Sequence, residues 1–380
     1  MKIIHLAERY WPHGGGVEYH LSQINKQLIA DGHTVSVITV AHESGLPKAE
    51  VHEGVTIIRI PLLTHVWHTK LLSIKGLAFI AKTWEKFHRW YYTARLIPYL
   101  KQAQVVQVHD VYWWIAPWWW LIPGKLFITF HGYENEFGPS RAQQRWHQLG
   151  AAFTDGSLAI GGFHEKWYRV TPTLVSFGAV EPGSKLENGR SQSLSTSHRI
   201  SSKKRVVFIG RLQEMTGARE LVEAVKILPT QVQQKLQIDM YGQGELQDEL
   251  QKIILQHSLP ITLHGFKTNA RDELYQADIA FVSQYLAILE ALVAGVKIIS
   301  YAGSEFKKEV LQSTPYSDSL EIAQTVNELA ELFQKMAEEQ DFYISDSERK
   351  SSSEKYQQWA QSQTWQVLTN TYYQLWNESK

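Results

Sequence analysis

Short apolar segments alternate with longer amphipathic segments along much of the chain. Residues 2–7 form an apolar run, residues 17–31 follow a helical pattern, and residues 33–40 form a second apolar run. Such runs are typical of parallel strands that are covered on both faces. The order strand, helix, strand predicts a βαβ unit at the start of the chain.

The same alternation begins again in the second half of the chain. Residues 205–210 and 236–241 read as strands, and a helical pattern lies between them at residues 220–227. The stretch before this series is rich in serine, glycine and charge, which is typical of a linker. We therefore predict an α/β fold with two doubly wound, Rossmann-like domains. The predicted parts are an N-terminal domain at 1–182, a linker at 183–204, a C-terminal domain at 205–350 and a final helical segment at 351–380.

One stretch of the second series combines two buried strands with a helix. Residues 279–283 and 297–300 read as strands, residues 286–294 as the helix between them, and Gly295 as the C-terminal cap of this helix. A helix that follows a parallel strand presents its first N–H groups at the carboxyl edge of the sheet, where they favour a phosphate. Glu290 lies one turn into this helix, where its carboxylate can accept hydrogen bonds from a sugar.

Three glycines precede the first helix. Gly14, Gly15 and Gly16 carry no side chains, so their backbone N–H groups can approach a ligand at the helix N-terminus. The pattern G-x-G-x-x-G of dinucleotide-binding enzymes is absent after the first strand, which argues against a dehydrogenase. A plain tight turn is the alternative interpretation of these glycines.

Residues 71–92 predict a basic amphipathic helix, with basic residues in one sector and apolar and aromatic residues on the opposite face. Its membrane-facing candidates are Lys75, Lys82, Lys86 and Arg89. Seven Lys or Arg but one acidic residue lie within residues 66–101. A helix of this kind suits an anionic membrane surface. It could equally dock its apolar face on its own sheet and leave its basic face in solvent, and the sequence leaves both interpretations open.

Five tryptophans fall within residues 113–120. A segment this rich in tryptophan is typical of a core plug or an interfacial anchor, and flat rings also stack on sugars. Residues 125–130 then read as a strand that ends at His131. A histidine at a strand end can contact a ligand or play an ordinary structural part, and spacing alone does not decide between the two.

Composition narrows the function classes. The 380-residue chain has a formal net charge of zero, with 38 basic and 38 acidic residues, which argues against general nucleic-acid binding. It contains no cysteine, so disulfides and thiolate metal sites are excluded. No apolar run reaches the roughly 20 residues of a membrane span, and the N-terminus starts with a strand rather than a signal-peptide core. A cytoplasmic protein fits these observations.

Five short motifs follow one another along the chain. They are G-G-G-x-E at 14–18, H-G at 131–132, G-R-L at 210–212, G-x-G at 242–244 and E-A-x-x-A-G at 290–295. In this order the chain resembles the family-four retaining glycosyltransferases of the GT-B fold, the glycosyl transferases of group 1. The resemblance covers nearly the whole chain. It implies two Rossmann-like domains that face a cleft, with ligand at the carboxyl ends of the strands, and a final helix that packs back toward the N-terminal domain.

The resemblance also implies a set of site residues. The catalytic candidates are His131, which would approach the donor sugar, and Glu290, which would bind ribose or sugar hydroxyls. Arg211 would hold the donor diphosphate, because a guanidinium fits phosphate oxygens bidentately. The donor-binding candidates are Gly15, Gly16, Arg211, Thr216, Gly242, Gly244, Gly265, Phe266, Leu286, Ala287 and Ile288. No cofactor and no metal ion are expected, since the nucleotide diphosphate sugar is a co-substrate.

Two departures from the family pattern leave alternatives open. The family usually carries a first glutamate before the one that Glu290 matches, and here the loop after Ser283 is too short to hold it. Thr216 replaces the lysine of the family's G-R-L-x-x-x-K-G motif, which removes a positive charge from the expected pyrophosphate site. One alternative is therefore a catalytically weakened, partner-binding subunit. Another is a GT-B epimerase, although the paired carboxylates that it needs are not identified.

The implied reaction moves a sugar from a UDP- or GDP-linked donor to a glycan or lipid-linked acceptor, with retention of the anomeric configuration. The basic helix favours an acceptor in envelope polysaccharide or glycolipid synthesis. It also favours a cytoplasmic enzyme that attaches peripherally to the inner face of an anionic membrane. No nucleic-acid partner is expected.

Overall fold

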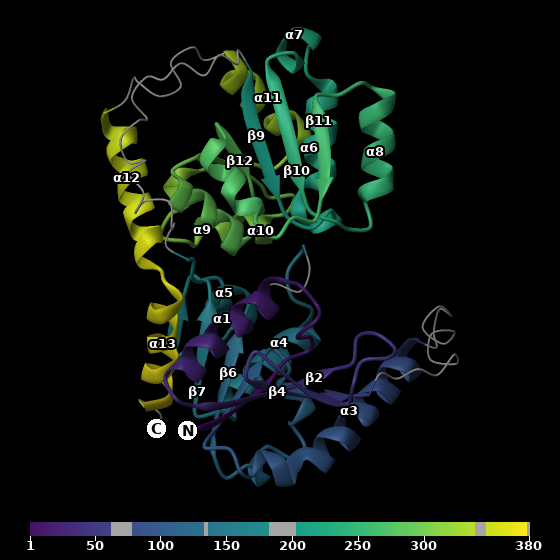
Figure 1. Cartoon of the computed structure of the whole chain (residues 1–380), viewed down its shortest axis with the longest axis vertical. Coiled ribbons are helices and arrows are strands. Elements are labelled where there is room, and N and C mark those ends of the chain that lie inside the picture. Colours follow the sequence, from purple (N-terminus) through teal and green to yellow (C-terminus); the bar gives the residue numbers. More distant parts are fainter. Residues whose placement is uncertain (62–77, 133–135, 182–202, 339–346, 378–380) are drawn as a thin grey trace. The chain divides into compact units, whose positions relative to one another are not determined.

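The structure, a computed structural model, describes residues 1–61, 78–132, 136–181, 203–338 and 347–377. It divides into two compact units (Figure 1). Unit 1 comprises Met1–Gly132, Pro139–Ser176 and Trp365–Lys380, and unit 2 comprises Tyr133–Gly138 and Phe177–Thr364. Nearly all of the linker predicted at 183–204 lies outside the described residues.

Unit 1 contains an eight-stranded sheet in the order β3-β4-β2-β1-β5-β6-β7-β8. Its strands are β1 (Lys2–Leu6), β2 (Thr34–Val40), β3 (Ala49–His52), β4 (Val55–Ile60), β5 (Val105–His109), β6 (Lys125–Phe130), β7 (Gly156–Ile160) and β8 (Leu174–Ser176). Neighbouring strands are parallel except β3 and β4, which form an antiparallel hairpin. The central strands are buried along most of their length, as their apolar runs predict.

Helices cover both faces of the unit 1 sheet. They are α1 (Gly16–Ala30), α3 (Ala78–Leu100), α4 (Arg141–Ala152), α5 (His164–Tyr168) and α13 (Trp365–Asn377), with two 3-10 turns after β5, η1 (Tyr112–Trp114) and η2 (Trp119–Leu121). The step from β1 to β2 and the step from β4 to β5 run in opposite directions along the sheet. Right-handed crossovers therefore place α1 and α3 on opposite faces. α13 packs beside α1 and covers β7 and β8.

Unit 2 contains a six-stranded, fully parallel sheet in the order β11-β10-β9-β12-β13-β14. Its strands are β9 (Lys204–Ile209), β10 (Leu236–Tyr241), β11 (Ile261–Gly265), β12 (Ile279–Phe281), β13 (Lys297–Tyr301) and β14 (Leu320–Ala323). The chain winds outward from β9 in one direction and then returns to continue from β12 in the other. Sheets of this kind bind ligands at the carboxyl ends of the strands beside this reversal point.

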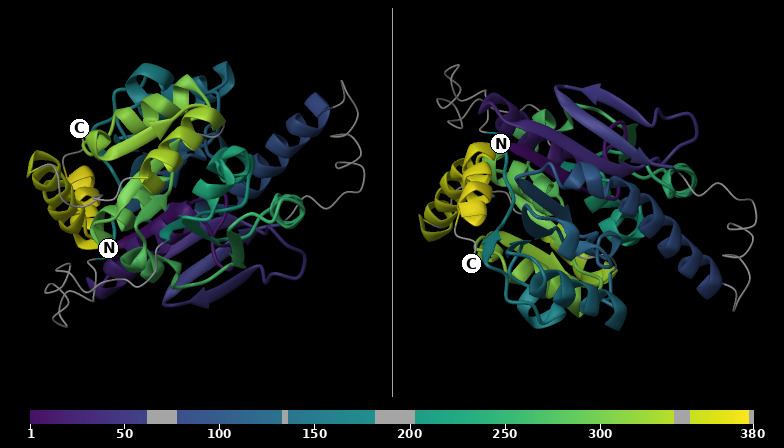
Figure 2. Two further views of the ribbon diagram at one scale, coloured as in Figure 1. Left: turned by 90° about the horizontal axis from the view of Figure 1, so that it is seen from above. Right: turned by 90° about the horizontal axis from the view of Figure 1, so that it is seen from below.

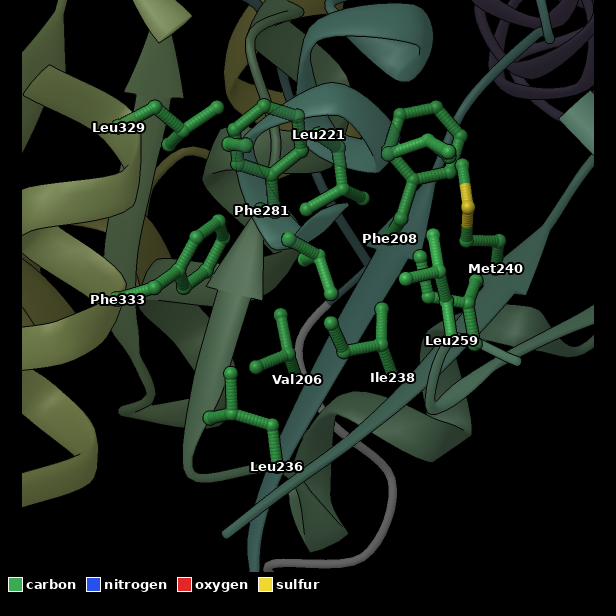
Figure 3. Packing of buried hydrophobic residues seen from close by; sticks show 14 of the residues in the cluster. Val206, Phe208, Leu221, Leu236, Ile238, Met240, Leu259, Phe281, Leu329 and Phe333 are labelled. Atoms are coloured by element: carbon green, nitrogen blue, oxygen red, sulfur yellow. The ribbon is translucent and has the colours of Figure 1, made fainter. Parts of the chain in front are cut away.

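The helices of unit 2 bury both faces of its sheet. They are α6 (Ala218–Ile227), α7 (Thr230–Gln233), α8 (Gln247–Gln256), α9 (Tyr285–Ala294), α10 (Glu305–Gln312), α11 (Val326–Glu338) and α12 (Ser347–Ser362), with the 3-10 turns η3 (Glu214–Thr216), η4 (Ala270–Gln276) and η5 (Ser317–Ser319). Figure 3 shows Phe208 and Phe281 of the sheet packed with Leu221 of α6 and Phe333 of α11. Full burial of each such side chain contributes about 1.5–3 kcal/mol to stability.

The final helical segment is two helices and not the single helix that the sequence pattern predicted. α12 and α13 are separated at Gln363 and Thr364. The Val180 N–H donates a hydrogen bond to the Gln363 carbonyl at 2.7 Å, which fixes the chain where the helix is interrupted. α12 packs on α9 within unit 2, whereas α13 belongs to unit 1.

The tryptophan-rich segment after β5 is divided between core and surface. Trp114 is completely buried beneath the guanidinium of Arg89, whereas Trp120 is 65% exposed. The indole N–H of Trp90, on α3, donates to the carbonyl of Trp113 at 2.8 Å. The segment therefore fastens α3 to unit 1, which confirms a core role for part of it.

Candidate functional site

Three loops at the carboxyl edge of the unit 2 sheet are joined by backbone hydrogen bonds. The Gly210 N–H donates to the carbonyl of Tyr241 at 3.1 Å, and the Gly242 N–H donates to the carbonyl of Gly265 at 2.9 Å. These bonds connect the ends of β9, β10 and β11. The predicted G-R-L and G-x-G motifs therefore lie next to each other, as a shared ligand site requires.

The glycines of these loops leave no room for a side chain. A Cβ atom at Gly242 would lie 1.7 Å from the Gly210 carbonyl oxygen, and one at Gly244 would lie 2.3 Å from the Leu212 carbonyl oxygen. Gly242 also has a φ of +147°, a backbone conformation that residues with side chains rarely adopt. The two loops can meet only because both positions are glycine.

Arg211 and Thr216 lie on the loop between β9 and α6 and differ in exposure. The side chain of Arg211 is exposed, so its guanidinium can reach a ligand. Thr216 is buried, and its hydroxyl lies 2.7 Å from the carbonyl oxygens of both Arg211 and Gln213. A hydroxyl has one proton to donate, and the loop's own carbonyls take it. The donor-binding role of Thr216 stays a prediction.

α9 begins at the same edge, shortly after β12. Its N-cap residue Gln284 makes no side-chain capping bond, so the N–H groups of Leu286 and Ala287 lack an acceptor within the helix. Such a helix start favours an anion. Ile288 differs, because its side chain is completely buried and its N–H donates to the Gln284 carbonyl at 2.9 Å. Its donor-binding role stays a prediction, with less of the residue available to a ligand than at Leu286 and Ala287.

Glu290 lies on α9 in a largely apolar environment. Burial raises its pKa from 4.5 to about 7; the nearby Arg271 opposes this rise and Glu181 adds to it. Arg271 is itself paired with Glu181 at 2.6 Å. A carboxyl group that titrates near neutrality accepts hydrogen bonds as a carboxylate and can donate one as an acid. Its hydrogen-bonding role therefore changes close to physiological pH.

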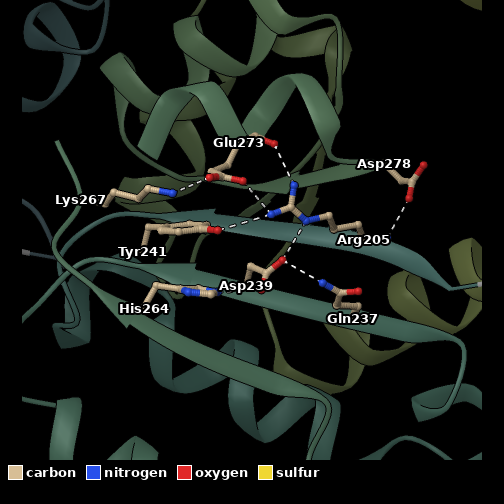
Figure 4. A network of polar contacts seen from close by, with 8 residues as sticks. All are labelled: Arg205, Gln237, Asp239, Tyr241, His264, Lys267, Glu273 and Asp278. Atoms are coloured by element: carbon tan, nitrogen blue, oxygen red, sulfur yellow. Dashed lines mark hydrogen bonds and ion pairs between the residues drawn. The ribbon is translucent and has the colours of Figure 1, made fainter. Parts of the chain in front are cut away.

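A polar network fixes β9, β10 and β11 beneath the loops (Figure 4). The Arg205 guanidinium lies 2.8 Å from the Asp239 carboxylate and 2.9 Å from the Glu273 carboxylate. His264 contacts Asp239 at 2.8 Å and stacks on the ring of Tyr241, with centroids 4.5 Å apart. These charges pair with one another, so the network ties the three neighbouring strands together.

Gly265 and Phe266 follow β11 at this edge. Gly265 has a φ of +71°, in the left-handed region that favours glycine. The ring of Phe266 is 70% exposed. An exposed aromatic ring offers a flat apolar surface to a ligand, and the donor contact of Phe266 stays a prediction.

The glycine loop of unit 1 ends at the start of α1. Gly15 is the N-cap residue, Gly16 is the first helical residue, and no side chain caps the helix. The Gly15 carbonyl accepts the Tyr19 N–H at 2.9 Å, which starts the helical hydrogen bonds. The earlier N–H groups have no acceptor within the helix, so this end of α1 also favours an anion.

His131 lies directly after β6 among other polar side chains. Its backbone N–H lies 3.2 Å from one carboxylate oxygen of Asp110. Its Nε2 lies 2.7 Å from Nδ1 of His109, and its ring meets that of His20 edge-on, with centroids 4.7 Å apart. Burial lowers the pKa of His131 well below 6.5, and His20 and His164 lower it further. His131 is therefore a neutral imidazole.

The structure adds His109, Asp110 and His20 to the candidate site. His109 and Asp110 end β5, which is the neighbour of β6 in the sheet, so a rule that collects polar residues at adjacent strand ends could have found them. His20 lies on α1, and no local motif marks it. Its place beside His131 depends on the packing of α1 on the sheet.

The basic sector predicted on α3 is only partly exposed. Lys82 is exposed, Lys86 is half-buried with its amine over the Trp146 ring, and Lys75 lies outside the described residues. Arg89 is buried, with its guanidinium 3.6 Å from the carboxylate of Glu8. The assignment of Arg89 to a membrane-facing surface is therefore wrong, because its charge is used inside unit 1.

The opposite, apolar side of α3 is the exposed one. Ile80, Trp84, Phe87 and Tyr91 are between 52% and 58% exposed. They recur at intervals of four, three and four residues, so they form one line along the helix, which we call the aromatic stripe. The prediction that the apolar face could dock on the sheet is wrong for this line of residues.

No helix in the described part of the chain combines the length and the apolar character needed to cross a membrane. The same residues contain no cluster of three or more His, Cys, Asp or Glu that could hold a metal ion. Among the described residues, the exposed Arg211 in unit 2 and the uncapped N-terminal turns of α1 in unit 1 and α9 in unit 2 are each suited to bind an anion.

Known sequences and folds agree with this geometry. The sequence profile of the glycosyl transferases group 1 matches residues 192–359, and that of glycosyltransferase family 4 matches residues 14–160. Together the two profiles cover more than half of the chain. No curated protein matches the sequence.

Several solved structures share the fold over nearly the whole chain. Sucrose-phosphate synthase from Thermosynechococcus elongatus is 16% identical, with 99% of this chain and 98% of that one covered and a TM-score of 0.66. HepE from Anabaena, solved with UDP and glucose, is 14% identical, with 98% of each chain covered and a TM-score of 0.66. WaaG, a glycosyltransferase involved in lipopolysaccharide biosynthesis, is 14% identical, with 97% and 98% covered and a TM-score of 0.63.

At these identities the solved structures establish the fold, and the two profiles establish the family. The parallel sheets of unit 1 and unit 2 are the two Rossmann-like domains of a GT-B protein. The chain therefore belongs to the group 1, family-four glycosyltransferases, and it is a glycosyltransferase with the GT-B fold.

Proposed function

We propose that the enzyme moves a hexosyl group from a UDP- or GDP-linked sugar to a glycan or lipid-linked acceptor, with retention of the anomeric configuration. The observation that carries this proposal is the carboxyl edge of unit 2, where three glycine loops meet beside the exposed Arg211. HepE, a structural relative, was solved with UDP and glucose, which supports a nucleotide-sugar donor.

The main chemical task is to stabilise the departing nucleoside diphosphate. Negative charge grows on it as the bond to the sugar breaks, so contacts that strengthen with this charge raise the rate. Arg211 supplies a guanidinium that binds two phosphate oxygens at once. The first turn of α9 adds oriented N–H groups that no capping side chain occupies. We assign the diphosphate to these two elements.

Glu290 binds hydroxyl groups of the donor in this proposal. A hydroxyl donates its proton to a carboxylate, so the ionised form of Glu290 binds more strongly than the acid. Because burial raises the pKa of Glu290 to about 7, the binding form is only partly populated at neutral pH. Donor affinity should then increase as the pH rises through neutrality.

Titration calorimetry with UDP, GDP and ADP tests the donor site. We expect wild type to bind one nucleotide selectively, and Arg211→Ala to bind it about 10- to 100-fold more weakly, since a hydrogen bond to a charged group contributes about 1.5–3 kcal/mol. Lys252→Ala, which removes an exposed cation from α8, is the control and should bind like wild type. If wild type binds none of the three nucleotides, the weakened, partner-binding alternative replaces the transferase proposal.

We also propose that α3 attaches unit 1 to the inner face of an anionic membrane, where a lipid-linked acceptor would be available. The aromatic stripe presents Trp84, Phe87 and Tyr91 to solvent, and tryptophan and tyrosine favour the level of the headgroups. The first turns of α3 extend away from the rest of unit 1 (Figure 2). Lys82 and Arg95 are exposed on the same helix and can attract anionic lipid.

The likeness to WaaG, which acts in lipopolysaccharide biosynthesis, supports an acceptor in envelope polysaccharide or glycolipid synthesis. Vesicle flotation with anionic lipid tests the membrane contact. The double variant Trp84→Ser, Phe87→Ser should lose most of the binding, because it removes two exposed aromatic side chains that would insert into the membrane interface. Leu255→Ser, which changes a residue that is 69% exposed on α8, is the control. Equal flotation of the double variant and wild type would contradict the proposal.

A further inference from the structure

A row of three histidines crosses adjacent strands of unit 1. His5 lies on β1, His109 ends β5, and His131 follows β6. Nδ1 of His5 lies 2.9 Å from Nε2 of His109, and Nδ1 of His109 lies 2.7 Å from Nε2 of His131. Both distances are those of hydrogen bonds. The group 1 motifs mark only the last member of this row.

The number of protons on the three imidazole rings determines how the two hydrogen bonds are oriented. Burial lowers the pKa of His5 to about 3 and those of His109 and His131 well below 6.5, so each ring is neutral and carries one N–H. A neutral imidazole donates from one nitrogen and accepts at the other. His109 bonds through both nitrogens, so it must accept from one neighbour and donate to the other. Both hydrogen bonds therefore point in the same direction along the row.

The two ends of the row decide that direction. Nε2 of His5 is buried and has no partner among the described residues, so a proton there would be a buried N–H without an acceptor. Such donors are rarer and more costly than an unused acceptor. His131, at the other end, is only partly buried. The protons of both hydrogen bonds therefore lie on the side away from the buried Nε2 of His5. Nδ1–H of His5 donates to Nε2 of His109, and Nδ1–H of His109 donates to Nε2 of His131.

We propose that His5 and His109 are positioning residues that hold His131 as the Nδ1–H tautomer. In this state His131 is a fixed hydrogen-bond donor toward an oxygen acceptor and does not serve as a general base. The hydroxyl or ring oxygens of a transferred sugar are acceptors of this class. The assignment of a sugar oxygen as the hydrogen-bond acceptor of His131 rests on the proposed transferase function. The assignment of the tautomer does not.

The other polar groups around His131 agree with a neutral donor. The ring of His20 meets it edge-on, and both His20 and His164 lower the pKa of His131 further. The Asp110 carboxylate accepts the backbone N–H of His131. His20 is in turn bonded to the hydroxyl of Tyr372 on α13 at 3.0 Å, which fixes its ring.

Long-range ¹H–¹⁵N correlation spectra of the histidine-labelled full chain measure the tautomer directly. The signals of His131 are assigned by their loss in His131→Gln. We expect the Nδ1–H pattern from pH 5.5 to pH 8.5 without titration. An Nε2–H pattern at His131, or a titration midpoint within this range, would overturn the proposal.

Two substitutions of His109 separate the hydrogen bond from the packing. An asparagine amide nitrogen can replace Nδ1 of histidine as a donor, so His109→Asn should keep the Nδ1–H pattern of His131. His109→Leu removes the donor, and His131 should then show a mixture of tautomers. If both variants leave the spectrum of His131 unchanged, His109 does not set its tautomer. The wild-type spectrum still decides the proposal if His109→Leu fails to fold.

Activity then distinguishes this proposal from the proposed function. Once a sugar donor and an acceptor substrate that support turnover are known, His109→Leu should lower kcat at least tenfold. His109→Asn should lower kcat by less than His109→Leu does. If nucleotide binding is absent but the Nδ1–H tautomer is found, the transferase proposal fails and the histidine row stands. If nucleotide binds and the tautomer is Nε2–H, the reverse holds.

Discussion

The two units differ in the chemical groups that line the candidate site at the carboxyl edge of each sheet. In unit 2 the edge is mainly backbone: glycine loops that touch through carbonyl and N–H groups, and a helix start without a side-chain cap. In unit 1 the corresponding edge includes side chains, with His131 held by His109 and Asp110. A site made of closely packed backbone has no room for an added Cβ atom. A site made of polar side chains depends on which atoms carry the protons. The two edges should therefore fail in different ways.

The largest expected effect is steric and belongs to unit 2. Gly242→Ala adds a Cβ atom that would lie 1.7 Å from the Gly210 carbonyl oxygen, at a φ of +147°. We expect nucleotide binding to be abolished and unit 2 to lose about 3 kcal/mol or more of stability, because both backbone strain and overlap must be relieved. Calorimetry and chemical unfolding measure the two effects.

Gly132→Ala is the matched control in unit 1, since a Cβ atom there meets nothing within 4 Å. It should change stability by less than about 1 kcal/mol. Equal losses in Gly242→Ala and Gly132→Ala would remove the steric difference between the edges.

The second effect is the pH dependence of donor binding through Glu290. With a pKa of about 7, the carboxylate fraction rises roughly tenfold between pH 6 and pH 8, so donor affinity should rise by about the same factor. Glu290→Gln should bind with little pH dependence over this range. A wild-type affinity that is flat with pH would show that the ionised form is not the binding form.

The same group predicts the opposite trend for the stability of the free protein. The folded pKa of Glu290 lies above its ordinary value of 4.5, so the folded state binds more protons than the unfolded state between these values. Stability therefore decreases as the pH rises toward and through 7, by roughly 3 kcal/mol from this group. Glu290→Gln should flatten that decrease in chemical unfolding.

The third effect is a buried hydrogen bond in unit 1. The hydroxyl of Tyr372 lies 3.0 Å from both Thr129 and His20. Tyr372→Phe removes both of these buried hydrogen bonds, and Thr129 keeps its bond from the Gln107 amide at 3.0 Å. We expect unit 1 to lose about 1–3 kcal/mol of stability. Tyr373→Phe, which removes a surface bond to Asp31, should cost much less. Equal costs would contradict the buried role of Tyr372.

The smallest effect belongs to surface charge. Arg219 pairs with Glu214 and Glu249 on the outside of unit 2, and both carboxylates are about half exposed. Solvent screens such pairs, so Arg219→Ala should change the free energy of unfolding by less than about 1 kcal/mol. A loss comparable to that of Gly242→Ala would mean that the loop before α6 depends on charge as much as on backbone packing.

Local sequence patterns predicted most of the fold and the backbone part of the site. Buried parallel strands appear in the sequence as short apolar runs. Each glycine loop appears as a motif, because the position that needs a glycine for steric reasons is itself the residue that the motif contains. Arg89 could not be placed in this way. Helical periodicity puts it with Lys82 and Lys86, but its contacts with Glu8 and Trp114 depend on how α3 packs.

The side-chain part of the site was harder to predict for the same reason. His5 and His109 are 104 residues apart, and their bond exists only because β1 and β5 are neighbours in the sheet. Thr216 illustrates the converse case. Its motif position suggested a ligand contact, yet its hydroxyl bonds its own loop. Proton positions and inward-turned hydroxyls depend on three-dimensional neighbours that no short motif contains.

The division of the chain between the units has a consequence for biosynthesis. α13 belongs to unit 1, but its residues follow all of unit 2 in the sequence. A ribosome therefore releases Tyr372, which fixes His20, only after the residues of unit 2 have been made. Until then the sheet of unit 1 lacks the helix that covers β7 and β8. A chain that is cut short before α13 would therefore leave this face of unit 1 unfinished, although every residue of unit 2 had been made.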